Sequence, residues 1–261
     1  MVMSPGLGYN VITVGGANNA VNFAYPDIWP CSAWKNPGSN NGDRNKPEVI
    51  APAAWLYTLK TCGQTTSFSP STCDQTAEVD GTSLAAPFVT GTAALLLQVY
   101  PVLSSWPEVV KAVIMATSKP LPNSDRDHYG AGLVNIGAAV DVISGVNGNW
   151  RGATPPQCSG SWPYTWPMYL VAGKQTRVVI AWSQDPNYDN YSNRPQADMD
   201  LTASNPRGQP LNIWGATWDN NYEYIDFVPT VTGTYSISVS KYRCDYTFAG
   251  NRIGLAWHQA Q

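Results

Sequence analysis

The chain has 261 residues and a formal net charge of −3, and only 13% of its residues are charged. That charged fraction is about half of what is usual in globular proteins, whereas the 11 tryptophans and 14 tyrosines make the chain rich in aromatic residues. The length suits two compact units better than one. We find no basic cluster that would follow a nucleic-acid backbone, and no apolar run of the roughly 20 residues that a membrane span needs. The composition therefore predicts an extracellular protein with neither kind of partner.

The start of the chain carries no sign of export. Met1–Pro5 has neither the basic start nor the apolar core of a signal peptide. The expectation of an extracellular protein therefore depends on composition and on the cysteines.

Two short strands are predicted in the first fifth of the chain. Tyr9–Gly16 is rich in β-branched residues and ends in two glycines, and Lys46–Pro52 has a similar apolar centre. Each run is short and bounded by glycine or proline, which favours a strand at both places.

A buried helix is predicted after Gly81, with Thr82 and Ser83 at its start. An apolar run that includes Ala85 continues to Leu97, and Pro101 ends it. We expect Pro87 to lie in the opening turn, where a missing N–H matters little, and Gly91 to let the helix approach a neighbour closely. A serine here has its own unpaired amide and the positive end of the helix dipole beside it, which suits a nucleophile. The plain alternative is that Thr82 and Ser83 only cap a core helix.

These blocks together resemble subtilisin-like serine proteases. In that family a Val-Gly-Gly strand end precedes a Lys-Pro-Glu-Val-Ile-Ala-Pro strand, and the Gly-Thr-Ser helix follows, which is the order of 14–16, 46–52 and 81–83 here. The family usually has glycine where this chain has Ala53, and often histidine where it has Phe88. The resemblance implies that Ser83 is the nucleophile, that its backbone N–H serves the oxyanion, and that the substrate is a polypeptide.

The resemblance continues after the serine. A helix with Pro107 in its first turn is predicted over 106–117, and a Gly-x-Gly turn in 129–135 precedes a last helix around 138–140. The similarity covers about residues 8–144 and implies part of a parallel sheet with helices, an α/β fold.

The resemblance also shows what this sequence lacks. Members of the family place an aspartate, a histidine and an oxyanion asparagine before the Val-Gly strand, but Met1–Gly8 contains none of these. The chain has only His128, predicted in a surface loop, and His258, in a predicted last strand. We therefore expect the C-terminal part of a peptidase domain, inactive or nearly so in isolation. Sedolisins share the Gly-Thr-Ser motif and remain an alternative, and a serine–lysine pair is disfavoured because no lysine is near Ser83 in sequence.

The five cysteines favour an oxidising compartment. Cys62 pairs most simply with Cys73 and Cys158 with Cys244, which leaves Cys31 as a free buried thiol or the partner of a cysteine outside this sequence. Reduced thiols in a core are the alternative for all five.

A boundary is predicted near 145–156, where glycine, asparagine and proline replace the helical pattern. Residues 1–146 would form the peptidase part and 147–261 a second unit. Five strands are predicted in this second unit at 177–182, 199–203, 224–227, 234–239 and 253–257, which is typical of an antiparallel β-sandwich. Ala181-Trp182, Asp198–Leu201 and Gly233–Val239 resemble the jelly-roll or pre-peptidase-like domains appended to many secreted subtilisin-like proteases.

No cofactor is required by this chemistry, and one metal is considered. Asp198 and Asp200 offer carboxylates to Ca²⁺, with Asp185, Asn187 and Asp189 nearby in sequence, although hydrogen bonds to a turn explain the two aspartates more simply.

A second class of function rests on the aromatic residues. A non-catalytic product is the alternative, with a β-sandwich that binds substrate or partner through exposed aromatics. Four tryptophans in predicted loops are its candidates: Trp162, Trp166, Trp214 and Trp218.

Overall fold

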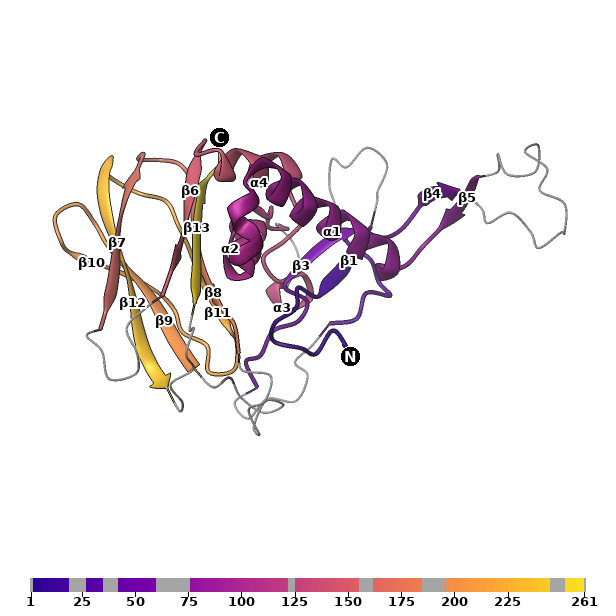
Figure 1. The fold of residues 1–261 in the computed structure, drawn as a ribbon, viewed down its shortest axis with the longest axis horizontal. Coiled ribbons are helices and arrows are strands. Elements are labelled where there is room, and N and C mark those ends of the chain that lie inside the picture. The colour runs from indigo at the N-terminus through magenta and orange to yellow at the C-terminus, as the bar shows by residue number, and fades with distance from the viewer. Residues whose placement is uncertain are drawn as a thin grey trace, which may run out of the picture.

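A computed structural model describes most of the chain in nine segments: residues 2–18, 27–34, 42–59, 76–121, 125–154, 162–184, 195, 197–244 and 252–260. Two antiparallel sheets formed by the C-terminal part (residues 147–261) lie side by side at one end of the molecule (Figure 1). Helices and a small mixed sheet from the N-terminal part (residues 1–146) follow, and a two-stranded hairpin projects at the other end.

The small sheet has the strand order β2-β1-β3. β1 (Val14–Asn18) runs parallel to β3 (Val49–Pro52), and β2 (Asp27–Ile28) pairs with β1 in antiparallel fashion. β1 and β3 fall within or beside the two predicted runs, but β1 begins five residues later than expected. All four residues of β3 are buried, as is usual for a strand in a parallel sheet.

The predicted Gly-x-Gly turn extends this sheet. Leu133 forms a parallel bridge with Ile50, beside β3. Gly130 and Gly132 have φ angles of +61° and +122°, and a Cβ on either would lie within 2.3 Å of a backbone oxygen. Only glycine fits both the conformation and the space, so the turn holds the chain against β3.

A hairpin that the sequence did not predict lies between β3 and the serine. β4 (Leu56–Leu59) pairs with β5 (Thr76–Val79) and projects away from the rest of the molecule (Figure 1). The polar residues between these strands lie outside the described residues.

Helices follow in the order predicted. α1 (Thr82–Val99) leads through a 3-10 helix (Pro101–Ser105) to α2 (Pro107–Thr117), which matches the predicted 106–117. The short α3 (Arg126–Tyr129) is capped by Asp125, and α4 (Ile136–Ile143) by Asn135, whose side chain accepts a hydrogen bond from the amide of Ala138 at 3.1 Å.

The C-terminal part consists of two four-stranded antiparallel sheets, ordered β10-β9-β12-β7 and β11-β8-β13-β6. All five predicted strands are present, and three further strands were missed, including one within the predicted boundary region. The strands are β6 (Gly148–Ala153), β7 (Tyr164–Leu170), β8 (Thr176–Trp182), β9 (Ala197–Ser204), β10 (Pro210–Gly215), β11 (Tyr222–Phe227), β12 (Gly233–Cys244) and β13 (Ile253–Gln259).

The two sheets share a hydrophobic core. Alternate residues of their strands meet in it, among them Met168, Ile180, Leu201, Ile237 and Leu255. β6 and β10 were missed because glycine, asparagine and proline are frequent in these edge strands and their few apolar residues do not alternate regularly.

A second core joins the two parts of the chain. Every residue of α2 after Pro107 is buried, because one side of the helix meets the N-terminal part and the other meets β8 and β13. β8 is buried on both faces: Val178 and Ile180 point into the core between the sheets, whereas Val179 and Ala181 pack with α2. The hydrophobic interior therefore continues across the predicted boundary.

Candidate functional site

Ser83 is held at the carboxyl ends of the parallel strands. After the β4–β5 hairpin the chain returns to the end of β3, where the amide of Gly81 donates a hydrogen bond of 2.6 Å to the carbonyl of Ala53. A Cβ on Gly16 of β1 would lie 2.7 Å from Ala53 and 3.4 Å from the Thr82 side chain, so β1, β3 and the start of α1 meet closely here. In α/β folds this edge of the sheet is where ligands and catalytic residues gather.

The first turn of α1 presents the serine to solvent. Gly81 precedes the helix with φ +154°, a conformation that residues with a Cβ rarely adopt. Ser83 is exposed, whereas Ala85 on the inner side is completely buried and fixes the helix against the sheet. The amide of Ser83 belongs to the first helical turn, where N–H groups have no intrahelical partner and face a negative charge favourably.

The expected position of Pro87 is wrong. The helix begins at Thr82, so Pro87 is its sixth residue and lies inside it rather than in the opening turn. A residue with an N–H at this position would donate to the carbonyl of Ser83, four residues earlier. Proline cannot, so the Ser83 carbonyl loses its usual intrahelical donor and the helix is weakened next to the nucleophile.

Neither histidine forms a hydrogen bond with Ser83 in the part of the chain that the structure describes. The ring of His128 lies against Trp34, with 3.5 Å between ring centroids, and His258 lies in β13 at the junction with the C-terminal part. Both histidines of the chain are among the described residues. Ser83 therefore has the setting of a nucleophile but no imidazole beside it.

A buried ionic cluster supports the strand that leads to this site. Glu48 is fully buried; its Oε1 accepts hydrogen bonds from Lys46 and, at 2.9 Å, from Lys111, and its Oε2 accepts one from the amide of Thr13 at 2.7 Å. Burial alone would raise the pKa of Glu48, but the charges of Lys111 and Lys46 reverse this and hold it below its usual value. Burial lowers the pKa of Lys46 to about 8. The cluster joins the ends of β1 and β3 to α2, and the sequence analysis did not detect it.

One face of α1 is apolar and exposed. Phe88, Leu95 and Val99 are 38–46% exposed, and a Cβ on Gly91 would have no atom within 4 Å. The expectation that Gly91 packs closely against a neighbour is therefore wrong within the described residues. By length and composition α1 is apolar enough to cross a membrane, but core helices of soluble proteins pass the same test.

Comparison with known proteins identifies the family. Residues 1–132, half of the chain, match the family described as Subtilase family. The chain belongs to the subtilase family. This match favours the subtilisin branch over sedolisins.

Two curated relatives agree with this assignment. The subtilase is 31% identical over 142 residues to Serine protease AprX of Bacillus subtilis (53% of this chain, 31% of that protein). It is 35% identical over 101 residues to an extracellular protease of Xanthomonas campestris pv. campestris, and the match covers 39% of this chain and 16% of that protein. The solved structure of the patellamide maturation protease PatA is similar at a TM-score of 0.38 and 22% identity, and the similarity covers 55% of this chain and 46% of that one. The subtilase thus spans no more than about a third of the length of these two curated relatives.

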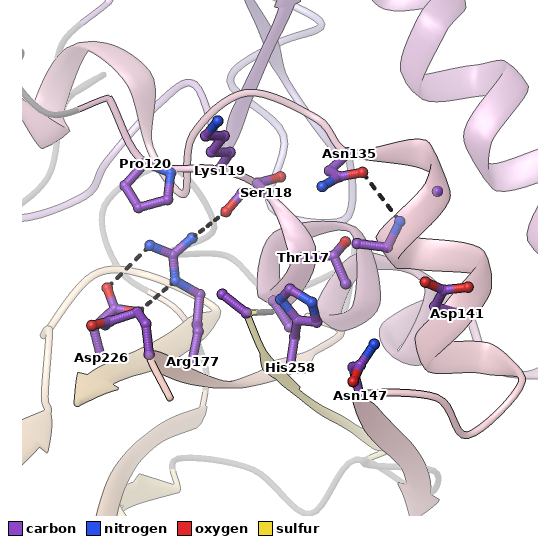
Figure 2. Close-up of a pocket in the computed structure, with 15 residues that line it drawn as sticks. Thr117, Ser118, Lys119, Pro120, Asn135, Asp141, Asn147, Arg177, Asp226 and His258 are labelled. Atoms are coloured by element: carbon purple, nitrogen blue, oxygen red, sulfur yellow. Dashed lines mark hydrogen bonds and ion pairs between the residues drawn. The ribbon is translucent and has the colours of Figure 1, made fainter. Parts of the chain in front are cut away.

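A cavity of about 450 Å³ lies at the junction of the two parts of the subtilase (Figure 2), and Ser83 is not among its lining residues. Arg177 dominates one side of it. Its Nε and Nη2 donate to the carboxylate of Asp226 at 2.7 and 3.0 Å, and its Nη1 donates to the carbonyl of Ser118 at 3.0 Å. Burial, then the charge of Arg177, lowers the pKa of His258, which is the cross-strand neighbour of Arg177. Because the guanidinium is fully engaged, this arginine fastens β8 to the end of α2.

The predicted disulfides lie largely outside the described residues. Cys62, Cys73 and Cys158 are not described, nor is the side chain of Cys244, so both pairings stay predictions. Cys31 is exposed and forms no disulfide, so the expectation of a buried thiol at this position is wrong.

The predicted calcium ligands are only partly brought together. Asp198 is buried and Asp200 is half-buried on the same face of β9, whereas Asp185, Asn187 and Asp189 are not described. Among the described residues, no group of three or more His, Cys, Asp and Glu could hold a metal ion. Calcium therefore stays a prediction.

The four candidate tryptophans do not form one surface. Trp166 is 2% exposed in the core of β7, and Trp162 packs against the same core. Trp214 on β10 and Trp218 are the exposed pair. The prediction was wrong for Trp166 because its strand, β7, was not recognised.

Proposed function

We propose that this subtilase is the nucleophile-bearing part of a serine endopeptidase that acts through an acyl-enzyme on Ser83. The observation that supports this most directly is an exposed serine in the first turn of α1, above the carboxyl ends of β1 and β3. A serine that only capped a core helix would not need the positive φ of Gly81 before it.

In the proposed reaction the Oγ of Ser83 attacks the carbon of the scissile carbonyl while its proton passes to a base. The amide of Ser83 donates to the oxygen that becomes negative. The C–N bond then breaks, the amine leaves with that proton, and water hydrolyses the remaining ester. The base and its acidic partner come, in this proposal, from polypeptide outside this sequence, and the exposed apolar face of α1 with the open space at Gly91 supports a partner segment there.

This chain alone is therefore expected to hydrolyse peptides poorly or not at all. A fluorophosphonate probe tests this, since it labels a serine only when that serine is activated. We expect little labelling of the purified chain, equal to that of Ser83→Ala. Strong labelling that is absent from Ser83→Ala would contradict the claim that no base is present.

A chimera tests the nucleophile itself. The polypeptide that precedes the aligned segment of AprX would be fused to this chain and assayed on casein. We expect hydrolysis that Ser83→Ala abolishes and that Ser104→Ala, in the 3-10 helix, leaves unchanged. A folded chimera that reacts with the probe at another serine would overturn the assignment.

We also propose that the protein is secreted and that the C-terminal part is a β-sandwich of the jelly-roll type. The low charged fraction and the extracellular protease among the relatives support secretion. The shared core of the two antiparallel sheets supports the sandwich. A second function, binding through the C-terminal part without catalysis, is favoured by the exposure of Trp214 and Trp218.

A further inference from the structure

A small cavity of about 160 Å³ lies on the outer face of the sheet that contains β9 and β12. It combines carboxylates with aromatic rings, a pairing that the chemistry at Ser83 does not use. Its lining residues are Asp198, Asp200, Ala216, Thr217, Trp218 and Tyr242.

The strand pattern explains how these side chains meet. Met199 and Leu201 of β9 point into the core between the sheets, so Asp198 and Asp200 point to the opposite face. In β12, Lys241 pairs with Met199 and Arg243 with Asp198. Tyr242 is thus an extra residue in a β-bulge, a device that redirects a side chain.

Two aromatic rings form a wall of the cavity. The rings of Trp218 and Tyr242 contact each other edge to face, with 4.7 Å between their centroids. Both are large and exposed, at 44% and 57%. Aromatic faces that stay exposed beside carboxylates attract organic cations through the ring quadrupole.

The carboxylate beneath this wall is incompletely satisfied. Asp198 is 2% exposed, its Oδ1 has no hydrogen-bond partner among the described residues, and its Oδ2 lies 3.9 Å from Nη2 of Arg243. That same Nη2 donates to the carbonyls of Pro195 and Trp218, both at 3.1 Å. Asp198 therefore shares the Arg243 guanidinium with two carbonyls. A buried carboxylate oxygen without a partner is costly, and a charged donor would stabilise it.

The surrounding charges also favour a cation. Burial raises the pKa of Asp198, the charge of Arg243 lowers it, and the charges of Asp200, Asp43 and Asp219 raise it, which together bring it to about 7. Among the charges that act most strongly on Asp198, Arg243 is the one cation. The other three are the carboxylates of Asp200, Asp43 and Asp219, so one positive charge faces four carboxylates in all. An added positive charge would relieve the repulsion between these carboxylates.

We propose that this cavity binds the cationic end of a basic side chain, lysine or arginine, from a polypeptide partner. The ammonium or guanidinium donates to Asp198 and Asp200, and the last methylene groups lie against Trp218 and Tyr242. A calcium ion would need six or more oxygen ligands and would gain nothing from the rings. A neutral sugar would stack on the rings but leave the carboxylate charge uncompensated.

Titration calorimetry on the Ser83→Ala chain tests the site independently of catalysis. The probes are Ac-Gly-Lys-Gly-NH₂, Ac-Gly-Arg-Gly-NH₂ and their uncharged counterparts with norleucine or citrulline. We expect saturable binding of the charged peptides at least tenfold tighter than that of the uncharged ones. Binding should strengthen from pH 6 to pH 8, because Asp198, and with it the neighbouring carboxyl of Glu223, ionises in that range while Arg243 stays charged.

Variants locate the binding. Asp198→Asn, Asp200→Asn and Trp218→Ala should each weaken binding of the lysine peptide about tenfold, and Asp198→Asn should reduce its pH dependence to the part that Glu223 contributes. Trp214→Ala is the matched control, since Trp214 is also exposed but lies on β10 outside the cavity. Thermal melts confirm that each variant is folded. If Asp198→Asn does not fold, Asp200→Asn tests the carboxylates instead, because Asp200 is partly exposed.

Four results would overturn the proposal. They are equal binding of the uncharged peptides, tighter binding of N-acetylglucosamine oligomers than of the charged peptides, stoichiometric Ca²⁺ binding that Asp198→Asn removes, and no saturable binding of either charged peptide. None of them bears on whether Ser83 is a nucleophile.

Discussion

At the scale of single residues, Glu48 supplies one negative charge that two buried lysines share. Replacing it by glutamine keeps its size but leaves Lys46 and Lys111 buried without their counter-charge. Removing one partner of a buried ion pair commonly destabilises a protein by about 3–5 kcal/mol. We therefore expect Glu48→Gln to lower the free energy of unfolding by about that amount, measured by urea denaturation at pH 7.

The control for Glu48→Gln is Glu78→Gln, since Glu78 is an exposed glutamate in β5. Its effect should stay within about 0.5 kcal/mol. If the two variants unfold at the same urea concentration, the cluster contributes nothing to stability.

Glu223 makes stability depend on pH. Burial raises its pKa from 4.5 to about 8, although Thr217 opposes this by donating its amide and hydroxyl hydrogens to the carboxylate. Between these two values the folded chain holds a proton that the unfolded chain has released, so the stability from this group falls as pH rises from about 4.5 to about 8.

Glu223→Gln should therefore flatten the pH dependence of unfolding. Glutamine stays neutral and still accepts from Thr217, so we expect the variant to be more stable than wild type by up to about 5 kcal/mol at pH 9, the free energy that a pKa change from 4.5 to about 8 represents, and nearly equal at pH 4. Urea unfolding across this range measures the slope, and Glu78→Gln should leave it unchanged. An unaltered slope in Glu223→Gln would assign the pH dependence to other groups, of which Asp198 acts in the same direction.

At the scale of elements, the position of α2 depends on small residues in the strand it covers. In β13, Ile253 and Leu255 enter the core between the sheets, while Gly254 and Ala256 face α2. A Cβ on Gly254 would lie 2.1 Å from the carbonyl carbon of Glu108. Gly254→Ala should thus push α2 away and lower the free energy of unfolding by about 2 kcal/mol or more in urea.

Gly91→Ala is the comparison for Gly254→Ala, because Gly91 lies in a helix with open space around it. Alanine there should leave stability unchanged or raise it by up to about 1 kcal/mol. Equal losses in both variants would mean that the contact of Gly254 with α2 does not control stability.

The sequence predicted elements with strong local patterns, and it failed where distant contacts decide. The periodicity of 106–117 predicted α2 correctly, but its burial on both sides needs β8 and β13, which lie 60 or more residues later. The Gly-Thr-Ser motif predicted the placement of Ser83 at a helix start. The cavity at Asp198 was beyond prediction, because it depends on a bulge at Tyr242 that only strand pairing reveals.

At the scale of the whole molecule, the shared core predicts that both parts of the chain unfold together. α2 packs against β8 and β13 on one side and the N-terminal part on the other, and Arg177 joins β8 to carbonyls at the end of α2 and to Asp226. Neither part can separate without exposing apolar residues of the other. We expect a single transition on heating, because cooperative units that share a core lose it together.

Two probes distinguish the parts. Circular dichroism at 222 nm reports on the helices, which all lie in the N-terminal part of the described chain, and tryptophan fluorescence reports mainly on the C-terminal part. The two melting curves should coincide in wild type. Arg177→Met, which removes the hydrogen bonds across the junction, should shift both to lower temperature by the same amount. Two separate midpoints, or a shift confined to one probe, would show that the parts are independently stable and that the core between them is not a cooperative connection.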